Sequence, residues 1–110
     1  MNRGEVWTVS GAGYSRKPRP AVIVQDDRFD VAASVTVCVL TTDPTEAPLF
    51  RPPVTPNGRN GRNGLRLASR LMVDKLTTVS KERLGERIGR LDDEDVVRLN
   101  RAILVFLGLV

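Results

Sequence analysis

The sequence has 110 residues, a formal net charge of +4, and 41% hydrophobic and 27% charged residues. This is a globular composition at a length that builds one hydrophobic core, so we expect a single domain over residues 1–110. The absence of histidine and the single cysteine exclude zinc sites, histidine-based acid–base pairs and Ser-His-Asp triads, so any catalysis must use Arg, Lys, Asp, Glu, Ser, Thr or Tyr.

The N-terminal part of the chain predicts two strands joined by a basic loop. Residues 5–10 alternate polar and apolar side chains, which favours a strand. Residues 11–18 form a glycine-containing basic loop, and the apolar run 21–24 is short enough for a buried central strand. The prolines on either side of Arg19 hold its backbone extended. We therefore expect Arg19 to be fixed at the entrance to the second strand.

A third strand is predicted at residues 34–40, ending at Thr41 and Thr42. Cys38 lies inside this apolar run, and we expect it to be buried and unreactive. Residues 43–56 contain five prolines. Proline cannot donate to a sheet, so any strand in this stretch must be short or lie at an edge.

The tandem Asn-Gly-Arg repeat at residues 57–64 favours tight turns. It predicts a mobile, positively charged loop outside the core. Further strands are predicted at residues 65–68 and 71–79, interrupted at Ser69-Arg70, and at residues 86–91.

One helix is predicted, with Asp92 as its N-cap and acidic residues in its first turn. Residues 103–110 are more apolar than one small barrel needs, which favours a contribution to a contact between copies. Five or six short strands and one C-terminal helix indicate a mainly β (α+β) fold, a small SH3-like antiparallel barrel. The apolar positions at helical spacing are Val96, Leu99, Ile103, Phe106 and Leu107.

Three side chains are candidates for phosphoryl chemistry. Arg19 can meet a phosphate with its planar fork, Thr41 can hydrogen-bond a phosphate or orient the attacking group, and Asp74 can act as an acid or base. Each residue also has a purely structural interpretation. These are a solvated arginine at a loop end, a threonine that serves a turn, and a surface salt bridge between Asp74 and Lys75.

The positive charge favours an anionic partner such as nucleic acid, although it also fits a merely basic protein. The N-terminus has no secretion signal, and the longest apolar stretch, residues 102–110, is about half of the roughly 20 residues that span a bilayer, so we expect a cytoplasmic protein. The side chains expected to contact RNA are Tyr14, Lys17, Thr42, Arg59, Arg62, Ser69 and Arg70.

Short motifs form one ordered pattern along almost the whole chain. They are Arg3-Gly4-Glu5-Val6-Trp7, Arg19-Pro20 before the apolar strand, Val39-Leu40-Thr41-Thr42, Ser69, Asp74-Lys75, residues 79–84 and Ile88-Gly89-Arg90-Leu91. Over residues 3–107 this pattern resembles the MazF/PemK (Kid) family of toxins from type II toxin–antitoxin modules.

The resemblance implies a homodimeric endoribonuclease, an mRNA interferase, that cuts single-stranded RNA at a short sequence without a metal or cofactor. Its products would be 2′,3′-cyclic phosphate and 5′-hydroxyl ends, and its partner would be a cognate acidic antitoxin. The resemblance assigns catalytic roles to Arg19 and Thr41, and Asp74 matches an acidic residue of the PemK/Kid branch. The chain departs from that branch at Met72, where the branch has an arginine, and in lacking histidine.

Two other functions are compatible with the sequence. One is a toxin of the same fold that inhibits DNA gyrase, as CcdB-like proteins do, and the other is a non-catalytic RNA-binding barrel. Arg19-Pro20 and Thr41 favour the ribonuclease, because gyrase inhibition needs no catalytic arginine.

Overall fold

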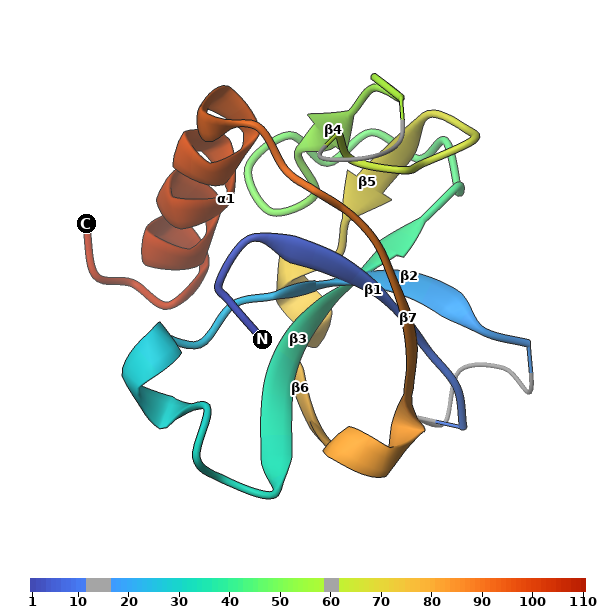
Figure 1. Cartoon of the computed structure of the whole chain (residues 1–110). Coiled ribbons are helices and arrows are strands. Elements are labelled where there is room, and N and C mark those ends of the chain that lie inside the picture. Colours follow the sequence, from blue (N-terminus) through green and yellow to red (C-terminus); the bar gives the residue numbers. More distant parts are fainter. Residues whose placement is uncertain (12–16, 59–61) are drawn as a thin grey trace.

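The computed structural model describes residues 1–11, 17–58 and 62–110, and this part of the chain forms a curled antiparallel sheet with one α-helix beside it (Figure 1). Tyr14 and Arg59 lie outside the described residues. The strands are β1 (Glu5–Val9), β2 (Arg19–Ile23), β3 (Ser34–Thr41), β4 (Pro53–Val54), β5 (Ser69–Leu71), β6 (Thr77–Ser80) and β7 (Leu84–Arg90). The helices are α1 (Asp93–Phe106) and the 3-10 turns η1 (Asp27–Phe29), η2 (Val73–Lys75) and η3 (Lys81–Arg83).

The strands are arranged in the order β4-β5-β3-β2-β1-β7, and β6 also pairs with β3. Side chains on the two faces of the sheet enter two different apolar clusters. Val22 and Leu40 belong to the cluster that contains Leu99 of α1, whereas Ile23 and Val39 belong to the cluster on the opposite face. The alternation of faces along β2 and β3 follows the period of two of an extended strand.

The prediction of β1, β2, β3, β7 and α1 is confirmed to within about two residues at each end. The carboxylate of Asp92 accepts a hydrogen bond from the Asp95 amide at 2.9 Å, which is the predicted N-cap. Leu99 is fully buried, but Phe106 and Leu107 are 46% and 55% exposed. The last turn of the predicted apolar stripe therefore lies outside this chain's core. No helix among the described residues is long and apolar enough to cross a membrane.

The prediction of a strand at residues 65–68 is wrong, and the prediction at residues 71–79 holds only at its two ends, where Leu71 lies in β5 and residues 77–79 lie in β6. Ser69 and Arg70, predicted as a break, lie in β5, and Asp74 lies in η2 rather than in a strand. Both β5 and β6 pair with β3, at different parts of that strand, and η2 connects β5 to β6. Pairing with β3 thus overrides the local pattern, because a strand's stability depends on its partners more than on intrinsic preference.

The prediction that residues 57–64 lie outside the core is also wrong at one position. Asn63 is fully buried, and its side-chain amide donates to the Thr55 carbonyl oxygen at 2.8 Å while its oxygen accepts from the Leu65 amide at 3.1 Å. Next to it, the Arg90 amide donates to the Arg62 carbonyl oxygen at 2.7 Å. Residues 62–64, hereafter the 62–64 segment, therefore lie against β7.

Candidate functional site

Three predicted site residues lie in one row across the sheet. Thr41 of β3 is the antiparallel partner of Arg70 of β5. On the other side of β3, Ala21 is the partner of Val39, and this is the last pair between the two strands. Arg19 lies two residues before Ala21 and Thr41 two residues after Val39, so each lies on the same face as that pair. Antiparallel partners point to the same face of a sheet, so Arg19, Thr41 and Arg70 form a row, hereafter the charged row, on one face.

The side chains of the charged row are half-buried. Within the described residues, neither Arg19 nor Arg70 donates a side-chain hydrogen bond, which leaves both guanidinium groups available to phosphate oxygens. The Thr41 hydroxyl oxygen accepts a hydrogen bond from the Asp43 amide at 3.1 Å. This fixes the oxygen and leaves the hydroxyl proton for a ligand.

Asp74 is paired with Arg51, which the sequence did not single out. Nε and Nη2 of Arg51 donate to the two carboxylate oxygens of Asp74 at 3.0 and 3.1 Å. The two side chains are 16% and 21% exposed. Hydrogen bonds from Thr45 lower the pKa of Asp43, and the charges of Arg51 and Arg70 lower it further. Because Asp43 follows the end of β3, the Arg51–Asp74 ion pair lies near that end.

The hydrogen bonds from Arg51 lower the pKa of Asp74 below its usual value. The carboxylate is therefore ionised at neutral pH, and both of its oxygens are occupied by the guanidinium. Such a group is a poor proton donor, and its environment favours a role in positioning. No feature of the local sequence separates Arg51 from the other arginines, since its partner lies 23 residues away.

Asp74→Asn is expected to destabilise the fold by about 2 kcal/mol at pH 7, because the substitution removes the charged partner of Arg51. Because the pKa of Asp74 is lowered in the folded state, its ionisation stabilises the fold at pH values above the unfolded pKa of 3.8. This stabilisation disappears as the pH falls through the folded pKa. Urea unfolding of both proteins should show the difference shrinking between about pH 5 and about pH 2. A pH-independent difference would contradict this assignment.

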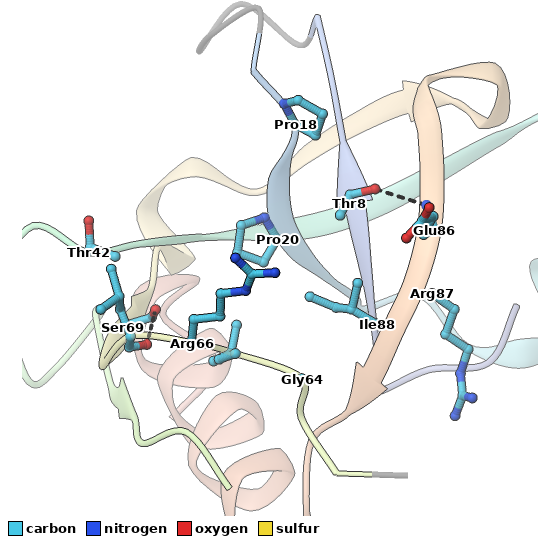
Figure 2. Close-up of a pocket in the computed structure, with 12 residues that line it drawn as sticks. Thr8, Pro18, Pro20, Thr42, Gly64, Arg66, Ser69, Glu86, Arg87 and Ile88 are labelled. Atoms are coloured by element: carbon cyan, nitrogen blue, oxygen red, sulfur yellow. Dashed lines mark hydrogen bonds between the residues drawn. The ribbon is translucent and has the colours of Figure 1, made fainter. Parts of the chain in front are cut away.

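A cavity of about 620 Å³ is lined by Pro20, which follows Arg19 in the sequence, and by Thr42, which follows Thr41 (Figure 2). Two predicted RNA-binding residues line it: Thr42, which is exposed, and Ser69, whose hydroxyl donates to the Leu67 carbonyl oxygen at 2.9 Å. Arg66 also lines the cavity, although its local sequence does not distinguish it from other exposed arginines. The remaining lining residues are Thr8, Pro18, Pro20, Gly64, Leu65, Leu67, Glu86, Arg87 and Ile88.

Two other predicted RNA-binding residues lie outside both the cavity and the charged row. Lys17 is exposed and precedes β2, and Arg62 is exposed in the 62–64 segment. Neither residue lines the cavity or belongs to the charged row. The thiol of Cys38 is buried, and burial raises its pKa to about 12, so it is a poor nucleophile, as predicted.

Known proteins resemble this chain in both sequence and fold. The "Probable endoribonuclease MazF" of Mycolicibacterium smegmatis is 50% identical over 110 residues, which cover 99% of this chain and 98% of the relative. A mycobacterial endoribonuclease solved in complex with its cognate antitoxin is 25% identical, has a TM-score of 0.78, and is matched over 100% of this chain and 97% of its own.

A second solved structure, the Mycobacterium tuberculosis toxin MazF-mt6, has a TM-score of 0.76 at 22% identity, over 94% of this chain and 96% of its own, and supports the same fold. The family model described as "PemK-like, MazF-like toxin of type II toxin-antitoxin system" matches residues 2–107. The chain therefore belongs to the PemK-like, MazF-like family of toxins of type II toxin–antitoxin systems.

Proposed function

We propose that this chain is a metal-independent endoribonuclease toxin that acts in the cytoplasm on single-stranded RNA at a short sequence. The observation that carries the proposal is the charged row, in which Arg19 at the start of β2, Thr41 at the end of β3 and Arg70 of β5 share one face. The proposal is also supported by the relative named as a probable endoribonuclease, at 50% identity over 99% of the chain.

The chemistry that fits this row is attack by the 2′-hydroxyl on the adjacent phosphate. A bond forms between the 2′-oxygen and phosphorus while the bond to the 5′-oxygen breaks. The 2′-hydroxyl loses a proton and the 5′-oxygen gains one, which gives a 2′,3′-cyclic phosphate and a 5′-hydroxyl end. Arg19 and Arg70 neutralise the charge that develops on the phosphate oxygens, and Thr41 donates a hydrogen bond to one of them. Arg51 holds Asp74 in position beside the row.

We also infer that the protein acts as a homodimer and is inhibited by an acidic cognate antitoxin. The net charge of +4 supports an acidic partner. The exposed apolar residues at the end of α1, among them Phe106 and Leu107, support a contact between copies. A solved structure with the same fold contains an endoribonuclease with its cognate antitoxin.

The test is incubation of the purified protein with a pool of single-stranded RNA in the presence of EDTA. We expect specific fragments whose 5′ ends are hydroxyls, labelled by a polynucleotide kinase without prior phosphatase treatment, and whose 3′ ends are cyclic phosphates. Fragments with 5′-phosphate ends would contradict the proposed chemistry. Intact RNA would reject the ribonuclease, and a simultaneous loss of gyrase supercoiling activity would assign the protein to gyrase inhibition.

A further inference from the structure

The cavity and the charged row are built from neighbouring residues of the same two strand ends. Pro18 and Pro20, which line the cavity, flank Arg19, and Thr42 of the cavity follows Thr41. Successive side chains of an extended strand point to opposite faces. The cavity therefore opens on the face opposite the charged row, at the same edge of the sheet. Because the row and the cavity share the edge where β2 begins and β3 ends, a strand of RNA that crosses this edge would place a phosphate at the row and a neighbouring nucleotide at the cavity.

The cavity has the size and lining that a planar base requires. Its volume of about 620 Å³ lies within the usual range of small-ligand sites. Pro20, Leu65 and Ile88 provide apolar surface for the faces of a ring, and Thr8, Thr42 and Glu86 place polar groups around it. The Thr8 hydroxyl oxygen accepts a hydrogen bond from the Glu86 amide at 2.9 Å, which ties the side of the cavity formed by β1 to β7.

Two arginines, Arg66 and Arg87, line the cavity, and the guanidinium of Arg66 is the one available to a ligand. Its guanidinium points toward Pro20, whereas the guanidinium of Arg87 points away from the cavity (Figure 2). Arg87 is also paired with Glu5 at 3.1 Å, whereas Arg66 makes no hydrogen bond or ion pair within the described part of the chain. A guanidinium can donate two hydrogen bonds to O6 and N7 of guanine. The carboxylate of Glu86, on the opposite side, can accept from the amino group of the same base.

We propose that the cavity is a subsite for a guanine next to the cleaved bond, with Arg66 as the residue that determines this preference. The inference rests on the proposed ribonuclease function and goes beyond it, because it names the recognised base and the side chain that selects it. Arg66 here acts on substrate choice, while the chemistry stays with the charged row.

The test compares cleavage of a random-sequence RNA pool by the wild type, Arg66→Ala and Arg66→Lys, with sequencing of the 5′-hydroxyl ends. The wild type should enrich guanine at one position next to the cut. Arg66→Ala should lose this enrichment and raise KM for the preferred RNA about tenfold, with kcat changed less than about twofold. Arg66→Lys keeps the charge but lacks the fork, so it should retain most of the affinity and lose the guanine preference.

Arg101→Ala is the matched control, since Arg101 is an exposed arginine of α1 that does not line this cavity, and its cleavage pattern should equal that of the wild type. Because Arg66 is exposed, its variants should have the thermal unfolding midpoint of the wild type. Unchanged guanine enrichment in both Arg66 variants, or a fall in kcat with enrichment intact, would overturn the inference while the proposed function stands. An inactive wild type would reject both.

Discussion

Replacement of Arg19 by alanine is expected to lower kcat for RNA cleavage by about 10²- to 10³-fold and to leave the fold intact. Arg19 is half-buried at the start of β2 and donates no side-chain hydrogen bond within the described residues, so its removal should not strand a buried partner. The charge on the phosphate oxygens grows in the transition state, and a preorganised guanidinium is therefore worth more there than in the bound RNA. Most of the loss should appear in kcat rather than in KM.

Single-turnover cleavage with excess protein measures this loss directly. Arg19→Lys should recover only part of the rate, because an ammonium group cannot contact two phosphate oxygens in the geometry of the guanidinium fork. Arg101→Ala serves as the control for the loss of one positive charge. Cleavage by Arg19→Ala within threefold of the wild-type rate, in a protein with unchanged thermal unfolding, would remove Arg19 from the reaction.

The charged row could be predicted in part because its members occupy recognisable places in local sequence. Arg19 is enclosed by two prolines at a strand entrance, and Thr41 ends an apolar run, and the structure places both residues at strand ends. The local sequence around these two residues does not predict that they lie close together on one face of the sheet. It depends on the register of β2 against β3, which is fixed by burial of alternate side chains in two different clusters.

The parts that the sequence did not predict depend on partners far along the chain. Ser69 and Arg70 look like a break in an apolar pattern, yet they pair with the end of β3 and with β4. The Asp74–Arg51 pair joins η2 to the proline-rich stretch. Asn63 has the local sequence of a turn, and its burial is favourable because the backbone groups of Thr55 and Leu65 satisfy its side-chain amide. Arg66 is a candidate for RNA binding only because the fold places it in the lining of the cavity.

Gly89→Ala is expected to destabilise the protein by about 2–4 kcal/mol, because the new methyl group would occupy space filled by backbone. An added Cβ would lie 2.1 Å from the Arg62 carbonyl oxygen and 2.4 Å from the Asn63 carbonyl carbon. These atoms can move away only if the 62–64 segment leaves β7, and that movement breaks the hydrogen bond from the Arg90 amide to Arg62. The buried amide of Asn63 would then lose part of its support.

Urea unfolding measures the cost, and Gly85→Ala on the same strand is the matched control. The Cβ added there would lie 2.4 Å from the Thr8 hydroxyl oxygen, which belongs to a side chain that can rotate, so we expect a loss of about 1 kcal/mol. Equal losses in the two variants would show that the 62–64 segment is not held by β7. Because this segment leads directly into the residues that line the cavity, Gly89→Ala should also raise KM for RNA relative to the wild type. Gly89, which leaves room for the 62–64 segment against β7, would therefore contribute both to the stability of the fold and to RNA binding.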